Sequence, residues 1–151
     1  MKGNFMVANL KKGLILSLLI LLVGCFSVST FDQYVYTQTT SLKVDALNVM
    51  DRATTDYASQ SDVVADLQSK LQKIYEYERN RPKNEISLQL WNTLLASDGN
   101  LLGGFLQRWK TETKLHATFI SEEKKLVGRA FDEIAGLESG KIKASQISLS
   151  K

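Results

Sequence analysis

The chain has 151 residues and is 44% hydrophobic, which is enough for one domain with a packed core. Its net charge of +3 is small, and its one cysteine and one histidine exclude a disulfide within the chain and a zinc site of several cysteines and histidines. A single proline suits long helices.

The first 24 residues have the organisation of a secretory signal peptide. Residues 1–12 contain three lysines and no acidic residue, and residues 13–23 (GLILSLLILLV) form an uncharged run rich in leucine and isoleucine. The run is shorter than the roughly 20 apolar residues that a membrane-spanning helix needs. An uncleaved signal anchor is the alternative, because extension of the run through Val28 approaches the lower limit of a span.

The apolar run ends in Leu22-Val23-Gly24-Cys25, which resembles the lipobox of bacterial lipoprotein precursors. In that family the cysteine receives a diacylglyceryl group, and the signal peptide is removed just before it. The resemblance implies cleavage between Gly24 and Cys25 and a lipid on Cys25, and two acyl chains are enough for stable membrane anchoring. A chance cysteine after a hydrophobic segment is the alternative, although an unpaired cysteine in an exported protein asks for an explanation.

Removal of the signal peptide also removes the net charge. Three of the 19 Lys and Arg residues precede residue 13, and the other 16 balance the 16 Asp and Glu residues. We therefore do not expect nucleic acid as a partner, because nucleic-acid-binding domains keep a basic face.

The location of the mature chain follows from the same segment. No later apolar run approaches the length of a membrane span, so we expect the domain to face the periplasm or the cell exterior. Phe26 and Ser27 lack the aspartate that resembles an inner-membrane retention signal in enteric lipoproteins. The outer membrane is therefore favoured in a Gram-negative host.

Three segments are expected after the signal peptide: a lipidated tether at residues 25–31, a helical bundle domain at residues 32–138 and a flexible polar tail at residues 139–151. In the first part of the domain, apolar residues recur at steps of three and four, as in an amphipathic helix. This stripe comprises Leu42, Ala46, Val49, Ala53, Tyr57, Val64, Leu67, Leu71 and Ile74.

The stripe does not require one unbroken helix. Ser59-Gln60-Ser61-Asp62 resembles a capped helix start, so we expect helices on both sides of a kink or short turn near residues 58–61. Pro82 ends the second of these helices, and Asn84 is expected to cap the next one.

Two further helices complete the expected domain. A turn at residues 97–100 precedes one helix, and a break near residues 115–118 precedes the last helix, which ends near residue 138. The prediction is an all-α fold, a small antiparallel bundle of about four to five helices.

Few residues suggest a catalytic, metal-binding or ligand-binding role. Gly103 and Gly104 each cost a helix ~1 kcal/mol relative to alanine, so we expect them to permit close approach of another helix backbone rather than ligand contact. His116 lies among apolar residues, and we interpret it as a partly buried structural histidine. We predict no catalytic residue, no metal site and no cofactor.

A corner of basic and aromatic side chains is the best candidate for a binding surface, if the helices fold back antiparallel. Its partner would be an acidic protein or an anionic envelope polymer. Basic residues at a helix C-terminus beside core aromatics are the alternative interpretation. The candidate residues are Tyr77, Arg79, Arg81, Lys83, Arg108 and Trp109.

The sequence therefore predicts a membrane-anchored, non-enzymatic helical lipoprotein of the cell envelope, which acts through protein or envelope-polymer contacts. A helical domain that binds or senses a small ligand is the second hypothesis. The third is a hydrolase with two carboxylates, because such chemistry needs no histidine or cysteine.

Overall fold

The structure is a computed structural model that describes residues 31–148, so the signal peptide, Gly24, Cys25 and the tether up to residue 30 lie outside the described residues. The described part is all-helical and contains no strand, which confirms the predicted all-α bundle. No helix in this part has the length and apolar character that crossing a membrane requires. The five α-helices are α2 (Gln33–Asp51), α3 (Ser61–Arg79), α4 (Glu85–Leu95), α5 (Leu102–Glu112) and α6 (Ala117–Glu138).

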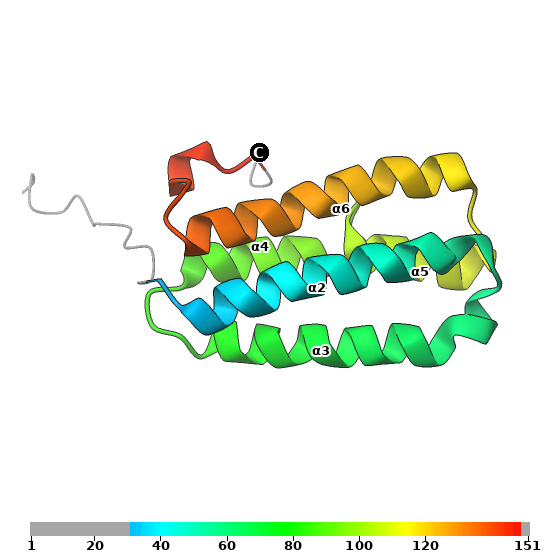
Figure 1. The fold of residues 1–151 in the computed structure, drawn as a ribbon, viewed down its shortest axis with the longest axis horizontal. Helices are drawn as coiled ribbons and strands as arrows, with labels where there is room; N and C mark the ends of the chain where they lie inside the picture. Colours follow the sequence, from blue (N-terminus) through cyan, green and yellow to red (C-terminus); the bar gives the residue numbers. More distant parts are fainter. Residues whose placement is uncertain (1–30, 149–151) are drawn as a thin grey trace, which may run out of the picture.

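The helices pack as an antiparallel bundle of four rods, one of which consists of two short helices (Figure 1). α2 and α3 form a hairpin, α4 and α5 follow one another along the third position, and α6 returns along the length of the bundle. α2 and α4 each pack closely against both α3 and α6. We call the end where α2 begins and α6 ends the base of the bundle.

One hydrophobic core runs through the bundle, because each helix turns an apolar face inward. Every residue of the predicted apolar stripe is buried except Tyr57, which is partly buried. Trp91 and Phe131 are fully buried and meet edge to face, with ring centroids 6.1 Å apart. Full burial of each large apolar side chain contributes ~1.5–3 kcal/mol of transfer free energy.

The chain reverses direction where a kink or short turn was expected. α2 ends at Asp51 and α3 begins at Ser61, so the expected break near residues 58–61 was too short and too late. The reversal passes through two short 3-10 turns, η1 (Arg52–Thr54) and η2 (Tyr57–Gln60).

The stripe continues through this reversal because the connection itself packs on the core. Ala53 is fully buried, and Tyr57 meets Trp109 edge to face at 5.3 Å. The expected cap at the start of α3 does not form, and the side chain that caps in this segment is Asp56, which accepts a hydrogen bond from the Ala58 N–H at the start of η2. Helical spacing alone therefore did not separate a continuous helix from a hairpin.

The segment after α6 packs on the bundle as far as Ser148, which corrects the expectation of a flexible tail over residues 139–151. Ile147 is only 3% exposed and joins the hydrophobic core. The Ser148 N–H and hydroxyl both donate hydrogen bonds to the carboxylate of Glu133 on α6. Residues 149–151 lie outside the described part.

The two adjacent glycines lie where α5 starts against the end of α4. A Cβ atom on Gly103 would overlap the carbonyl oxygen of Leu95, and one on Gly104 would overlap the carbonyl oxygen of Gly99. The predicted close approach of backbones is therefore confirmed, and it fixes how α5 follows α4.

Candidate functional site

The six residues of the predicted binding surface do not form one surface. Trp109 is fully buried, and its indole N–H donates to the carbonyl oxygen of Thr55 at 3.0 Å. Arg108 pairs with Glu112 and lies over the ring of Phe119. The 19 residues of α3, about 28 Å of helix, separate this region from the other four residues. At the base lie Tyr77, Arg79, Arg81 and Lys83.

Arg81 belongs to a buried network of ionic groups at the base. Its guanidinium donates to both carboxylate oxygens of Glu138, each at 3.0 Å, and to one oxygen of Glu78 at 2.7 Å. Asn84 donates to the other oxygen of Glu78 at 2.9 Å, and the backbone N–H of Asp32 donates to Glu138 at 2.7 Å. We call these five residues the Arg81 cluster.

The Arg81 cluster joins three parts of the chain. It contains the residue before α2, the last turn of α3 with the connection to α4, and the last residue of α6. Glu78 is 0% exposed and Glu138 is 3% exposed, and such burial requires pairing with a counter-charge and hydrogen bonds. Asn84 precedes α4 as expected but does not cap it, because its side-chain amide donates to Glu78.

Asp32 connects the cluster to the surface. Its carboxylate accepts hydrogen bonds from the N–H groups of Tyr34 and Val35, and from the Tyr77 hydroxyl at 2.7 Å. Burial raises the pKa of Asp32, but the Tyr77 hydrogen bond, the α2 amides and Arg81 together bring that pKa below its ordinary value. The same hydrogen bond raises the pKa of Tyr77.

Arg81 stays positively charged in this setting. Burial lowers the pKa of its guanidinium, but Glu138 and Glu78 outweigh burial and raise that pKa above the ordinary arginine value. The Arg81 cluster therefore joins helix ends at the base through ion pairs and hydrogen bonds.

The two buried carboxylates of the Arg81 cluster are engaged within the fold. Glu78 and Glu138 are buried, and Arg81, Asn84 and the Asp32 amide bond their oxygens. In this part of the chain, no group of three or more His, Cys, Asp or Glu residues is arranged to hold a metal ion. His116 is exposed just before α6, so the interpretation of a partly buried histidine was wrong.

A surface groove of about 580 Å³ lies between α3 and the α4–α5 connection, and we call it the α3–α5 groove. It forms because α3 packs closely against α4 but not against α5. Its floor is apolar, and three of the floor side chains are almost fully buried: Leu71, Leu102 and Leu106.

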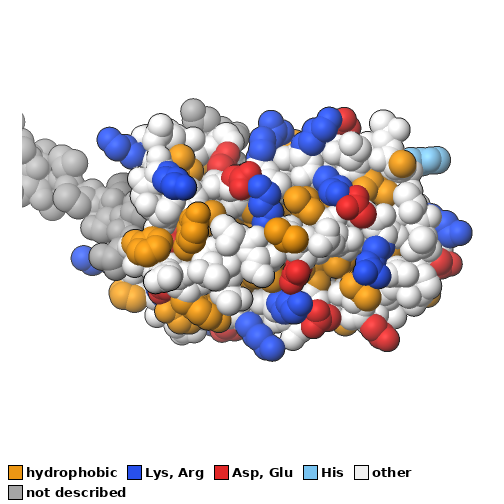
Figure 2. Space-filling view, in the orientation of Figure 1, with side chains coloured by type: hydrophobic (Ala, Val, Ile, Leu, Met, Phe, Trp, Pro, Cys, Tyr) orange, Lys and Arg blue, Asp and Glu red, His pale blue; other side chains and the backbone are white. Residues whose placement is uncertain are grey.

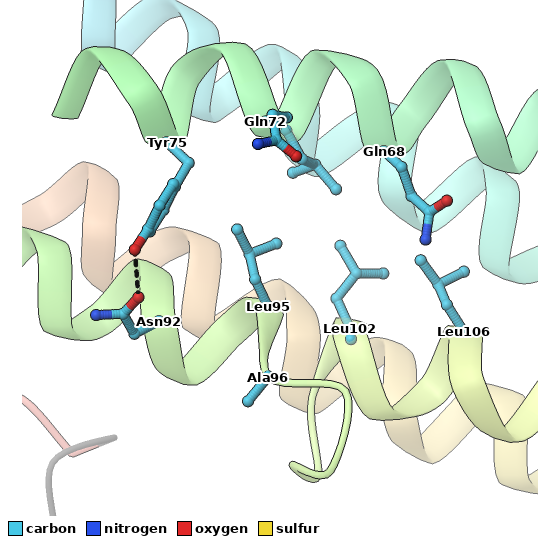
Figure 3. Close-up of a pocket in the computed structure, with 10 residues that line it drawn as sticks. Gln68, Gln72, Tyr75, Asn92, Leu95, Ala96, Leu102 and Leu106 are labelled. Atoms are coloured by element: carbon cyan, nitrogen blue, oxygen red, sulfur yellow. Dashed lines mark hydrogen bonds between the residues drawn. The ribbon is translucent and has the colours of Figure 1, made fainter. Parts of the chain in front are cut away.

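The rim of the α3–α5 groove is polar but uncharged (Figure 3). Gln68 and Gln72 reach from α3 over the leucines of the opposite wall. The Tyr75 hydroxyl donates to Asn92 at 2.8 Å, which bridges α3 and α4 at one end of the groove. None of the ten lining residues is acidic, basic or a histidine. Burial raises the pKa of Glu123, which Arg108 partly offsets, but Glu123 does not line the groove.

No family model matches the chain, and no curated protein or solved structure matches it either.

The groove residues were not found from the sequence. Gln68 and Gln72 are ordinary exposed polar positions of an amphipathic helix, and Leu102 and Leu106 fit a core stripe. The one signal near the groove was the glycine pair, since Gly103 also lines it.

Proposed function

We propose that the chain is a lipid-anchored lipoprotein of the cell envelope that acts as a non-enzymatic interaction module. In this proposal a lipid on Cys25 holds the domain on a membrane, facing the periplasm or the cell exterior, and on the outer membrane in a Gram-negative host. The α3–α5 groove takes a protein partner. The uncharged, apolar-floored groove is the observation that carries the interaction role.

The chemistry of the α3–α5 groove favours apolar side chains as its occupants. An anionic envelope polymer would need cations, and none of the lining residues is basic. Leucines on the floor suit the apolar face of a partner segment, while rim amides from Gln68, Gln72 and Asn92 suit its backbone or polar side chains. Insertion of an amphipathic helix between two helices is a common mode of this kind.

A small apolar ligand is the second candidate for the groove. The volume of about 580 Å³ lies within the range of roughly 300–1,000 Å³ that is usual for ligand pockets. The groove is open on the surface rather than enclosed, however, which leaves much of a small ligand in water. We therefore favour a protein segment, whose remaining surface extends beyond the groove.

The anchor is tested by labelling cells with palmitate. The wild-type chain incorporates label and fractionates with membranes, whereas Cys25→Ser incorporates none and keeps its signal peptide. Ser27→Ala is the matched control and labels as wild type. If Cys25→Ser still labels, or if wild type stays unlabelled with an intact N-terminus, the chain is not a lipoprotein.

The groove is tested by site-specific photo-crosslinking in intact cells. A photoreactive residue in place of Gln72 is expected to give a discrete protein adduct. The same residue in place of Ser41, an exposed position on α2 outside the groove, gives none. Gln68→Trp, which places a large ring over the floor, abolishes the adduct. An adduct that persists with Gln68→Trp or forms equally from position 41 contradicts the assignment of the groove.

A further inference from the structure

The base of the bundle exposes aromatic side chains that the core does not use. Among the described residues, four large apolar side chains are well exposed, and three of them lie at the base. These are Phe31 at 57%, Tyr34 at 50% and Tyr77 at 42% exposure, while Val44 lies along α2. The rings of Tyr34 and Tyr77 are 5.0 Å apart, so they form a continuous patch. Figure 2 shows hydrophobic side chains gathered at this end, next to the start of the described chain.

Exposed cations lie at the same end of the bundle as this patch. Arg79 and Lys83 follow Tyr77 at the end of α3, and both are exposed, as are Lys141 and Lys143 after α6. The acids Glu78 and Glu138 are buried in the Arg81 cluster and do not reach the surface. The remaining acids here are Glu76, which pairs with Arg79, Glu85, and the partly exposed Asp32, which accepts the hydrogen bond from Tyr77. At the surface of the base, four cations therefore stand against three acids, a small positive excess.

The covalent chain limits how far this end can lie from a membrane. Phe31 is six residues after Cys25. Six extended residues span at most about 20 Å, so an anchor at Cys25 holds Phe31 within that distance of the lipid.

We propose that the base rests directly on the membrane surface and binds anionic phospholipid. We call the contact surface, made by Phe31, Tyr34, Tyr77, Arg79 and Lys83, the base face. Its aromatic rings lie at the level of the headgroups, where tyrosine is favoured, and its cations contact lipid phosphates. This inference deepens the proposed function and rests on its claim that the chain is attached to a membrane ahead of residue 31.

The contact sets the orientation of the bundle. Because the long axis runs away from the base, the domain stands on end, and the α3–α5 groove faces sideways above the lipid (Figure 1). A partner would then approach parallel to the membrane.

The contact is tested with the full processed protein, purified from membranes and reconstituted in vesicles of phosphatidylcholine with phosphatidylglycerol that carries brominated acyl chains, which quench tryptophan. Tyr34→Trp reports on the base, and Lys114→Trp is the control at the opposite, exposed end. Trp91 and Trp109 are fully buried and give a constant background. We expect the fluorescence of Tyr34→Trp to be quenched and that of Lys114→Trp to be unchanged. Equal quenching at the two positions, or none at position 34, overturns the proposal.

The electrostatic part is tested in the Tyr34→Trp background. Lys83→Asn removes a cation without adding backbone strain, because Lys83 has a φ of 57° and asparagine tolerates this left-handed conformation. The ratio of membrane-seated to free base is expected to fall about fivefold per cation removed. Lys114→Gln, at the far end, is the neutral control. If Lys83→Asn leaves quenching unchanged, or if vesicles of phosphatidylcholine alone quench as strongly, anionic lipid is not the ligand.

These results separate the two proposals. An uncleaved membrane segment would attach the chain at the same end as a lipid on Cys25, so the contrast between positions 34 and 114 reports on the base in either case. Palmitate labelling alone decides whether the attachment is a lipid. Labelled protein without quenching at position 34 overturns only the contact, and quenching without label overturns only the lipoprotein assignment.

Discussion

At the scale of single residues, Arg81 makes the most buried ion pairs found among the described residues. It bonds two carboxylates that are almost completely shielded from water, Glu78 and Glu138. From the sequence, we expected Arg81 on an exposed binding surface, because it lies in one basic group with Arg79 and Lys83. The partner Glu138 is 57 residues away, and local patterns contain no information on such a contact.

Replacement of Arg81 by methionine should be strongly destabilising. Arg81→Met leaves two buried carboxylates without their counter-charge, so the free energy of unfolding should fall by about 3–5 kcal/mol. Urea denaturation at neutral pH measures this loss. Arg79→Met is the control, because Arg79 makes only an exposed pair with Glu76 and should lose at most about 1 kcal/mol. Similar small losses of unfolding free energy in both variants would show that the Arg81 cluster does not stabilise the fold.

The lowered pKa of Asp32 predicts a pH-dependent contribution to stability. A carboxylate whose pKa is lower in the folded than in the unfolded state stabilises the fold above the unfolded value, which is near 3.8 here. That contribution is lost as the pH falls through the folded pKa. Asp32→Asn keeps the capping geometry and should cost about 1 kcal/mol at pH 7, because charged hydrogen bonds exceed neutral ones by about that much.

The measurement is urea unfolding of wild type and Asp32→Asn over a series of pH values. The difference between the two proteins should shrink as the pH falls below about 4. Asp62→Asn, an exposed acid in the first turn of α3, is a control outside the cluster. A difference between wild type and Asp32→Asn that does not depend on pH would contradict the role of the ionised carboxylate.

At the scale of the elements, helix type and most helix ends were predicted from periodicity and breakers. The end of α3 before Pro82 and the turn after α4 are local features, and they were found. The reversal at residues 52–60 was not predicted. Its apolar side chains continue the helical spacing, although its backbone is not a continuous α-helix. The packed segment after α6 was missed because it has no periodic pattern of apolar residues. Its burial depends on one residue, Ile147.

The glycines of the bundle offer a matched pair of substitutions. Gly103→Ala places a methyl group against the Leu95 carbonyl, so it should destabilise by about 1–3 kcal/mol although alanine favours helix. Gly128→Ala on α6 meets only Lys43 and Leu47 side chains at 3.7 Å and beyond, and should stabilise by about 0.5–1 kcal/mol. Thermal unfolding of both variants checks the two signs. Stabilisation by Gly103→Ala would mean that α4 and α5 do not approach as closely as described.

At the scale of the whole molecule, the candidate surfaces depend on how the helices pack against one another. The sequence patterns contain no information on this packing. The α3–α5 groove exists because α5 stands away from α3, although both helices have normal apolar stripes. The base face combines Phe31 and the first turn of α2 with the end of α3 and the connection that follows it. The predicted residues Tyr77, Arg79 and Lys83 are part of it, whereas Arg108 and Trp109 lie at the opposite end.

The uneven packing of the rods predicts uneven local stability. α2 packs between α3 and α6, whereas α5 has α4 and η2 as its close neighbours. In native-state hydrogen exchange, amides in the middle of α5 should exchange about 10-fold faster or more than those in the middle of α2. Equal protection of the two helices would show that the bundle opens only as one unit. A partner in the groove should slow exchange in α5 selectively.

The hydrogen bond from the Asp32 backbone to Glu138 also has a consequence in time. The two residues are 106 positions apart, so at about 5–20 residues per second a ribosome adds Glu138 roughly 5–20 s after Asp32. Throughout this interval the first turn of α2 lacks its final hydrogen-bond partner. The start of α2 is thus synthesised early, but this hydrogen bond can form only after the end of α6 has been made.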